Sequence, residues 1–580
     1  MFAGLPLVRI TPQNKRTGGD VASSHRFRSR PEKQPVHITS DITNYHNMKT
    51  FLQLIFTTLL CLLPTITRAQ HKMPPLPTNK DTLLVHQLAL IGHDKALGKQ
   101  IDSLVQQQID KNQWSIQLRH DVGTYPDIVL LLDDDAAILE HEECRYSQTI
   151  QLLFPGKKSL DVMHRISVKD AEDAARQITK FIRKTFYSGM RPSYSTVFTS
   201  GEEGYASYRV PAVMALPNGR ILSIAEGRNS TRTDYAENDI VMKYTDDDGQ
   251  TWSPLFRIAE AGAASLNNPT GVYIEELHRI LVLFQEYPPK MNSALVRPGL
   301  KGKNIVRTYV IYSDDYGQTW SKKKEITNEV KQPEATSYTT GPGAGIRVTA
   351  GPDKGRILIP VNVSGGKNGW YNYLVASDDL GKSWHILPQQ SDYGTSESQI
   401  VQVGESSFAL NARCHRYEGI EVDQPYNWNP WNYGQVTRNR GMISVNISGE
   451  RMLWYETQIR QDLPDPLCQG SIIRYSGLNG DDRSRLLFSN PASQFSYATG
   501  KKYSRTAPAR VNGTVRVSYD NGKTWAHSKR IYGNRFTEFQ YSVLAHTASN
   551  RIACLFEAAP IIKMAVFDMK WLTSGEDKGK

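Results

Sequence analysis

The chain has 580 residues, of which 39% are hydrophobic and 22% are charged, so it is long enough for more than one domain of a soluble protein. Its formal net charge is +11, but residues 1–47 contribute +4 and residues 48–69 a further +2, which leaves about +5 on the remaining chain. So small an excess of positive charge does not argue for nucleic-acid binding, although it is compatible with an anionic substrate.

The first 69 residues are predicted to lie outside the folded protein. Residues 1–47 are polar and basic without an apolar period, which favours a non-native or disordered leader and places the true start at Met48. Residues 48–69 contain Lys49, an apolar run from Phe51 and a small-residue cleavage site at Ala69, the pattern of a secretory signal peptide. We therefore expect an exported protein, in the periplasm, at the cell surface or outside the cell.

Residues 70–190 are predicted to form a small α/β accessory domain. Apolar residues at helical spacing predict a helix over 97–111, and short apolar runs at 128–132 and 149–154 predict buried strands. The segment Ser167–Asp170 resembles a capping box before a second helix whose apolar side begins at Ala171.

Residues 191–580 carry a repeated pattern, S/T-x-D-x-G-x-T/S-W, which we call the Asp-box. Four copies end at Trp252, Trp320, Trp384 and Trp525, and an eroded copy ends at Trp454, so the period is about 70 residues. Each copy follows an apolar run, and its Asp and Gly suit a tight turn, which indicates a strand, a turn and a strand. Because about 70 residues suit a four-stranded blade, we predict a mainly β protein with a six-bladed β-propeller, its last blade unmarked.

A Tyr-Arg-Val-Pro segment around Arg209 precedes the boxes, and in this combination the region 195–575 resembles the sialidases, retaining exo-glycosidases that remove terminal sialic acid. Sialidases hold the substrate carboxylate with three arginines, and the resemblance implies Arg209, Arg413 and Arg510 here. Arg505 is the alternative to Arg510. Guanidinium groups suit this role because they present a planar fork to a carboxylate and stay charged.

The resemblance also implies the catalytic residues. The segment Tyr541-Ser542 matches the sialidase nucleophile, and Glu397 matches the glutamate that activates it. Asp234 matches the acid/base residue. Two further side chains are implied to bind or support the substrate: Arg228 beside Asp234, and Glu557, which holds the first arginine.

These residues predict an exo-α-sialidase whose partners are sialylated glycans, glycoproteins or glycolipids, with no nucleic acid and no membrane span in the mature chain. Two alternatives stay open: a hydrolase of a related ulosonic acid, such as deaminated sialic acid or a keto-deoxy sugar, and an inactive sialidase-like binding module. No phosphate loop and no Cys/His metal spacing occurs, so we predict no cofactor and no metal. The four cysteines after residue 69 are too scattered to predict a pairing.

Overall fold

The computed structural model describes the chain from residue 86 onward, with gaps. The residues left out are 1–85, 92–94, 115, 120–127, 132–147, 154–163, 168–169, 231–232, 365–369, 415–438, 479, 481, 494, 497–500, 503–509, 534–537 and 580. The predicted leader and signal peptide therefore lie outside the described residues, as do Arg505 and Cys144.

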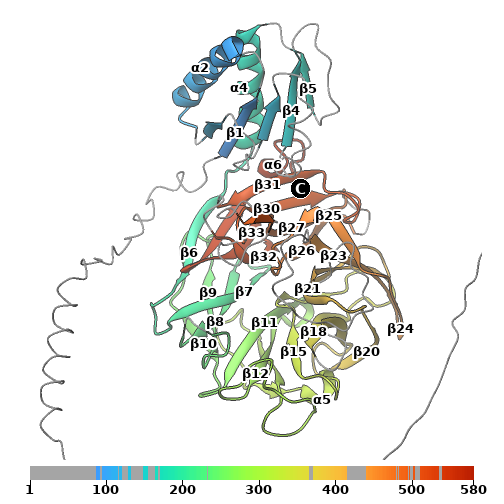
Figure 1. Cartoon of the computed structure of the whole chain (residues 1–580). Helices are drawn as coiled ribbons and strands as arrows, with labels where there is room; N and C mark the ends of the chain where they lie inside the picture. The colour runs from blue at the N-terminus through green and yellow to red at the C-terminus, as the bar shows by residue number, and fades with distance from the viewer. Residues whose placement is uncertain are drawn as a thin grey trace, which may run out of the picture. The chain divides into compact units, whose positions relative to one another are not determined.

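Residues 86–187 contain a parallel sheet and two helices. The sheet order is β2-β1-β3-β4-β5, and every neighbouring pair of strands is parallel. Figure 1 shows both helices on the same face of this sheet, where they pack on each other and on Leu90 and Ile116. The predicted helices and strands are confirmed. The elements are β1 (His86–Ile91), α2 (Lys95–Lys111), β2 (Ile116–Arg119), β3 (Ile128–Leu131), β4 (Gln148–Leu153), β5 (His164–Ser167) and α4 (Ala171–Tyr187).

The predicted capping box is wrong by three residues. Ser167 ends strand β5, whereas the N-cap of α4 is Asp170, whose carboxylate accepts a hydrogen bond of 2.8 Å from the backbone N–H of Asp173. A carboxylate at this position satisfies a free N–H of the first turn and also complements the helix dipole, so Asp170 is the stronger cap.

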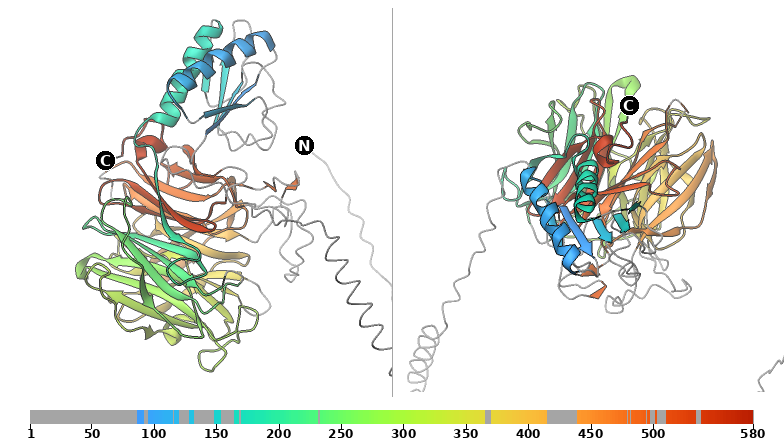
Figure 2. Two further views of the ribbon diagram at one scale, coloured as in Figure 1. Left: turned by 90° about the vertical axis from the view of Figure 1, so that its left-hand side faces the viewer. Right: turned by 90° about the horizontal axis from the view of Figure 1, so that it is seen from above.

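The rest of the chain forms six antiparallel sheets that follow one another around a ring, as the colour sequence in Figures 1 and 2 shows. The predicted six-bladed propeller is confirmed. Blades 1 to 3 consist of β7 (Ser207–Ala215), β8 (Ile221–Arg228), β9 (Asp239–Thr245) and β10 (Phe256–Ala259); β11 (Ser265–Ile274), β12 (Arg279–Tyr287), β13 (Arg307–Ser313), β14 (Lys324–Glu325) and β16 (Gly343–Ala344); and β15 (Ser337–Thr340), β17 (Ile346–Arg347), β18 (Ile357–Ser364), β19 (Trp370–Ser377) and β20 (His385–Gln390).

Blades 4 to 6 continue the ring, and the last one is closed by a strand from the start of the propeller. The strand β6 pairs antiparallel with β34, so residues 193–199 complete the blade that ends the chain. The elements are β21 (Thr395–Gln402), β22 (Ser407–Cys414), β23 (Asn439–Ser448), β24 (Arg451–Trp454) and β25 (Gln458–Pro464); β26 (Ser471–Ser476), β27 (Arg485–Pro491), β30 (Gly513–Ser518) and β31 (His527–Tyr532); and β32 (Gln540–His546), β33 (Ile552–Ala558), β34 (Ile561–Phe567) and β6 (Ser193–Thr199).

Five smaller elements accompany these sheets. They are η2 (Glu275–Leu277), α5 (Thr327–Val330), α6 (Met569–Leu572) and the paired strands β28 (Phe495–Ser496) and β29 (Lys501–Lys502). No helix in the described part of the chain combines the length and apolarity needed to cross a bilayer.

Each intact Asp-box forms the turn between the third and fourth strands of a blade, as predicted. In the first copy the Asp247 carboxylate accepts hydrogen bonds from the hydroxyls of Thr245 and Thr251 and from the backbone N–H of Thr251, at 2.6–2.9 Å. The Thr245 hydroxyl in turn accepts from the N–H of Gly249, which has φ +81°. Trp252 donates to Ser195 on the neighbouring blade, so the box also joins blades.

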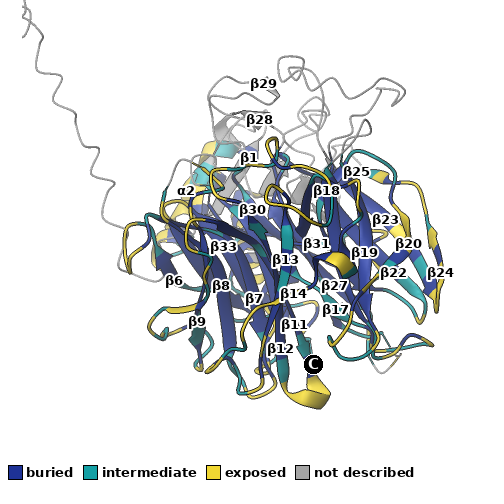
Figure 3. Ribbon diagram, turned by 90° about the horizontal axis from the view of Figure 1, so that it is seen from below, coloured by how far each residue is buried: buried dark blue, intermediate teal, exposed yellow. Residues whose placement is uncertain are grey.

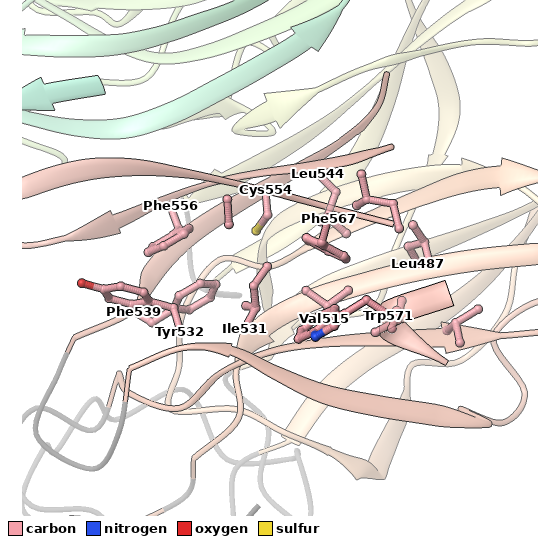
Figure 4. Close-up of a cluster of buried hydrophobic side chains, with 14 of the residues drawn as sticks. Leu487, Val515, Ile531, Tyr532, Phe539, Leu544, Cys554, Phe556, Phe567 and Trp571 are labelled. Carbon is pink, nitrogen blue, oxygen red and sulfur yellow. The ribbon is translucent and has the colours of Figure 1, made fainter. Parts of the chain in front are cut away.

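Apolar side chains fill the spaces between neighbouring blades. Figure 4 shows one such cluster, in which Phe539, Phe556 and Tyr532 pack together and Trp571 of α6 covers the far side. Figure 3 shows the blade strands mostly buried, with exposed residues gathered in turns and at outer edges. This packing gives the ring a rigid centre, because apolar surface is buried on both faces of most sheets.

The antiparallel order of the strands separates the Asp-boxes from the other edge of the ring. In each blade the first strand begins at one edge of the ring, and the antiparallel second strand returns to that edge and ends there. The Asp-boxes follow the third strands and therefore lie at the opposite edge. Arg209 and Tyr541 stand near the beginnings of first strands, and Arg228 and Arg413 near the ends of second strands. Four of the predicted site residues therefore share one edge.

The box carboxylates should stabilise the fold. We expect Asp247→Ala to lower the free energy of unfolding by about 1–2 kcal/mol, because it removes four hydrogen bonds within one turn, including one from the backbone N–H of Gln250. Urea denaturation checks this, with Glu456→Ala as the control, since that exposed carboxylate makes no described hydrogen bond or ion pair.

The Thr245 hydroxyl and the other box donors outweigh the effect of burial and lower the pKa of Asp247 to about 2. Its contribution is thus full above the ordinary pKa near 3.8 and is lost as the pH falls towards 2. A variant as stable as wild type at pH 7 would contradict this role.

Candidate active site

A cavity of about 310 Å³ opens at the edge of the ring opposite the Asp-boxes. Seven of the eight predicted site residues line it, and the eighth, Glu557, contacts Arg209. These residues come from blades 1, 4, 5 and 6, so the closed ring brings together positions more than 300 residues apart. The complete lining is Arg209, Val210, Glu226, Arg228, Asp234, Tyr235, Asn267, Asn268, Tyr287, Ser337, Thr339, Asn362, Trp370, Ser396, Glu397, Arg413, Arg510 and Tyr541.

Arg209 is held by a buried carboxylate. Its Nε donates to Glu557 Oε2 at 2.6 Å, while the other oxygen of Glu557 accepts from the backbone N–H of Val210, also at 2.6 Å. Glu557 is only 3% exposed, whereas the Arg209 side chain is 32% exposed. The two-point contact therefore fixes the base of Arg209 and leaves the rest of its guanidinium facing the cavity.

Tyr541, Glu397 and Arg413 form one connected group. The Tyr541 hydroxyl donates to Glu397 Oε1, and Arg413 Nη1 donates to Glu397 Oε2 at 2.6 Å and to the Tyr541 oxygen at 3.4 Å. Burial opposes ionisation of Glu397, but the charge of Arg413 outweighs it and lowers the pKa of this carboxyl. Burial and the neighbouring Glu397 raise the pKa of Tyr541 well above 10. The resting pair is therefore a carboxylate and a neutral phenol.

Arg510 completes a ring of cations around the phenol. Its guanidinium donates to Gln540 Oε1 at 3.0 Å and to the Leu467 carbonyl at 2.9 Å. The Cζ atoms of Arg209 and Arg510 lie 5.5 and 5.6 Å from the centre of the Tyr541 ring. Arg413 donates to the hydroxyl oxygen of the same tyrosine. Three guanidinium groups in a half-buried space repel one another, so the arrangement favours an anion that binds all three.

Asp234 stands on the blade 1 side of the cavity with Arg228. Arg228 Nη1 donates to Asp234 Oδ1 at 2.7 Å, while its Nε and Nη2 both donate to Glu226 Oε2 at 2.8 and 2.5 Å. The Asp234 side chain is 67% exposed, in contrast to the buried Glu226 and Arg228. Partial burial opposes ionisation of Asp234, but the charge of Arg228 outweighs it and lowers the pKa. An exposed carboxyl facing a charged cavity is placed to exchange protons with a bound molecule.

Irregular backbone turns several of these side chains into the cavity. The pairing of four first strands shifts near its start, at residues 209–212, 267–270, 395–398 and 540–543. Within these bulges Val210, Asn268 and Tyr541 have φ of +51°, +55° and +38°. A β-branched or aromatic residue with positive φ is strained, and such strain persists where the surrounding structure holds it for function. The bulges explain how strands of blades 1, 4 and 6 aim Arg209, Glu397 and Tyr541 at one point.

Some members of the site did not emerge from the sequence. Glu226, two residues before Arg228, shares a strand face with it, and that i, i+2 spacing could have signalled the pair. Asn268, Tyr235 and Tyr287 also line the cavity, but nothing in their local sequence distinguishes them. Of the two predicted candidates for the third arginine, only Arg510 is among the described residues, and it lies in the site. In the described residues no cluster of His, Cys, Asp or Glu is arranged to hold a metal ion, and Cys414, Cys468 and Cys554 are buried.

Residues 219–554 match the model of the BNR repeat-like domain, and this segment is more than half of the chain. The chain belongs to the BNR repeat-like family. The match begins within blade 1 and ends within blade 6, so it spans the four intact Asp-boxes and most of the cavity lining but leaves out Arg209, Val210 and Glu557.

Two curated relatives of this BNR repeat-like protein are named as sialidases. The sialidase of Micromonospora viridifaciens is 27% identical over 396 residues, which cover 66% of this chain and 55% of that protein. The exo-alpha-sialidase of Aspergillus fumigatus is 28% identical over 385 residues, which cover 61% of this chain and 79% of that protein. The solved structure of Hadza microbial sialidase Hz136 has a TM-score of 0.54 at 23% identity and covers 66% of this chain and 69% of that one, which shows a shared fold.

Hydrogen bonds and a nearby carboxylate hold Arg510 in the cluster. Burial and the charge of Arg413 oppose ionisation of Arg510, but its pKa is still raised, with Glu397 among the causes. We expect Arg510→Met to lower the free energy of unfolding by about 1–2 kcal/mol, because it removes the hydrogen bonds to Gln540 and to the Leu467 carbonyl and the attraction to Glu397. Urea denaturation measures it. A variant as stable as wild type would show that relief of the repulsion from Arg209 and Arg413 offsets the lost bonds.

Proposed function

We propose that this protein is an exo-α-sialidase, a retaining glycosidase that removes terminal sialic acid from glycans. The observation that carries the proposal is the group in which Arg209, Arg413 and Arg510 surround the Tyr541–Glu397 pair, with Asp234 on the other side of the same cavity. The sialidase names of the two curated relatives support it. The proposed substrates are sialylated glycans, glycoproteins or glycolipids. The apolar segment from Phe51 supports export of the protein.

The three guanidinium groups bind the carboxylate that sialic acid carries on its anomeric carbon. This contact both neutralises the repelling cations and fixes the sugar ring with its anomeric carbon over Tyr541. The clamp thus turns a bimolecular encounter into an oriented one, which is a large part of the catalytic effect of a binding site.

In the first chemical step Tyr541 attacks the anomeric carbon while Glu397 takes the phenol proton. A neutral phenol suits this carbon because a carboxylate nucleophile would approach against the carboxylate of the substrate; tyrosine is the known exception among glycosidase nucleophiles. Asp234 gives its proton to the leaving oxygen, and the glycosidic bond breaks to leave a sugar joined to Tyr541. The charge of Arg413, 3.4 Å from the phenol oxygen, stabilises negative charge that develops there.

In the second step water replaces the tyrosine. Asp234, now a carboxylate, takes a proton from water as the water attacks the anomeric carbon, and Glu397 returns the proton to the phenol oxygen. Two displacements at the same carbon retain its configuration. Glu557 takes no part in proton transfer and acts by holding Arg209.

Removing the nucleophile should abolish turnover without unfolding the protein. We expect Tyr541→Phe to lower kcat on a fluorogenic α-linked N-acetylneuraminic acid glycoside by at least about 10²–10³-fold, since the ring fits but no oxygen remains to attack. Tyr371→Phe is the matched control, because its hydroxyl bonds Gln332 away from the cavity. Full activity of Tyr541→Phe would overturn the proposal. Turnover of a deaminated sialoside alone would redirect it to that ulosonic acid.

The pH dependence should differ between the free enzyme and its complex. In the free protein Arg228, with smaller effects of Arg209 and Arg510, keeps the pKa of Asp234 low. A bound carboxylate offsets the charge of the arginines and therefore raises that pKa, so Asp234 stays protonated to higher pH in the complex. With a poor leaving group, the alkaline limb of kcat should lie about one pH unit above that of kcat/KM.

Asp234→Asn supplies the control for this profile. The substitution should remove the alkaline limb from both curves, because no carboxyl remains to lose a proton. Coincident limbs in the wild-type protein would mean that the substrate carboxylate does not act on Asp234.

A further inference from the structure

A second hollow of about 430 Å³ adjoins the cavity on the side of Asp234. It shares Arg209, Arg228, Asp234 and Tyr235 with the first and is walled by Asn292, Ser293 and Ala294. These three belong to the loop of residues 288–306, which joins β12 to β13 and which we call the β12–β13 loop. If Asp234 protonates the leaving oxygen, as the proposed function has it, the rest of the glycan lies in this hollow.

The β12–β13 loop carries positive charge and no negative charge. Its 19 residues include no Asp or Glu, and its four cations are all exposed: Lys290, Arg297, Lys301 and Lys303. None of the four takes part in an ion pair among the described residues. Two acids beside the loop have other partners: Glu286, just before it in sequence, binds Lys323 at 2.7 Å, and Asp234, which lines the same hollow, binds Arg228. The charge of the loop is therefore not neutralised from within the protein.

These cations lie close to the second hollow. Lys290 is two residues before Asn292, and Arg297 is three after Ala294, so their Cα atoms are within about 8 and 11 Å of residues that line it. The backbone N–H of Arg297 donates to the carbonyl of Asn304 at 2.8 Å, which brings Lys303 beside Arg297. The screening length is about 8 Å at physiological salt and about 30 Å at 0.01 M, so these charges act on a ligand in the hollow most strongly at low salt.

The loop is held in place before any ligand arrives. The buried Lys331 donates through Nζ to the carbonyls of Gly299 at 3.0 Å and Val306 at 3.4 Å, which joins the two arms of the loop. Arg307 Nη2 donates to the Gly302 carbonyl at 2.6 Å. Val296 and Val306 pack on Tyr287, against which Tyr235 of the hollow also packs. A preorganised loop loses little entropy on binding, so its charge is available for selectivity.

We propose that the β12–β13 loop forms a subsite for a negatively charged sugar next to the one that is cleaved, and so directs the enzyme to glycans with a second carboxylate or a sulfate beside the terminal sialic acid. The inference rests on the proposed function for the placement of the glycan. The observation that carries it is a fixed loop that walls the hollow beside Asp234 through Asn292, Ser293 and Ala294 and that also carries four unneutralised cations.

The test compares three soluble substrates: sialyl-lactose, α-2,8-linked disialyl-lactose and sialyl-lactose sulfated on the galactose. Release of the terminal sialic acid is measured as kcat/KM at 20, 150 and 500 mM NaCl. The variant replaces all four cations, Lys290→Gln, Arg297→Gln, Lys301→Gln and Lys303→Gln. A matched control replaces four exposed lysines outside this loop, Lys322, Lys354, Lys382 and Lys523, each with Gln.

We expect wild type to prefer the disialyl and sulfated substrates over sialyl-lactose at low salt. The loop variant should lose about tenfold of that preference, while its kcat/KM for sialyl-lactose changes less than twofold. The preference should also fall as salt rises, and the control variant should behave as wild type. The disialyl and sulfated substrates distinguish a carboxylate subsite from a sulfate subsite.

Three results would overturn the inference. An unchanged ratio of turnover between the substrates with a second anionic group and sialyl-lactose in the loop variant would refute the subsite while leaving the proposed function intact. A loss seen only in a parallel assay of a sialoglycolipid in phosphatidylserine vesicles, and with none of the three soluble substrates, would assign the cations to lipid headgroups instead. No turnover of any of the three sialosides by wild type would remove the proposed function and the inference together.

Discussion

The mutual repulsion of three guanidinium groups is the constraint around which this site is built. Arg209, Arg413 and Arg510 come from three blades and meet at one phenol, an arrangement that a flexible chain would avoid. Each is held from behind: Arg209 by Glu557, Arg413 by Glu397 and Arg510 by Gln540 and a backbone carbonyl. The blades beneath supply the rigidity, since clusters such as that in Figure 4 lock neighbouring sheets together.

The same repulsion links the two halves of the cavity. A bound carboxylate that neutralises the charge of the arginines also changes the electrostatic potential at Asp234, which lies on another loop. Arg228 sits between the two halves and divides its donors between Glu226 and Asp234. Glu226 is buried and carries a pKa raised by that burial, so its charge persists only with Arg228 beside it. In the proposed mechanism, binding and proton transfer are therefore coupled through charge.

The amino-acid sequence predicted the propeller because its repeat is dictated by local chemistry. Each Asp-box needs a hydroxyl, a carboxylate and a glycine at fixed spacing to close one turn. The pattern is therefore visible in the amino-acid sequence, and it gives both the length of the repeat and the number of blades. The six sheets follow from that period, whereas the pairing of β6 with β34 emerged only from the structure. The predicted site residues came from a family resemblance, and the structure places them together at one edge.

What the sequence could not supply is the local backbone that aims these residues. The shifts in pairing at residues 209–212 and 540–543 have no marker, because Val210 and Tyr541 are residues that ordinarily disfavour positive φ. Asp170 was missed as a cap because Ser167 matched the same pattern one turn earlier. In both cases tertiary contacts decide between local options that the sequence leaves nearly equal.

The strand β6 has a consequence for how the protein is made. It is synthesised before any other strand of the propeller, yet its partner β34 is nearly the last. An early strand must therefore wait with an open edge until some 360 residues have emerged, and contacts of such long range make folding slow and exposed to misassembly. Glu557, which holds Arg209, lies in that same final blade, so a nascent or truncated chain would carry the first arginine without its support. The arginine cluster is complete only after the first and last strands of the propeller have paired.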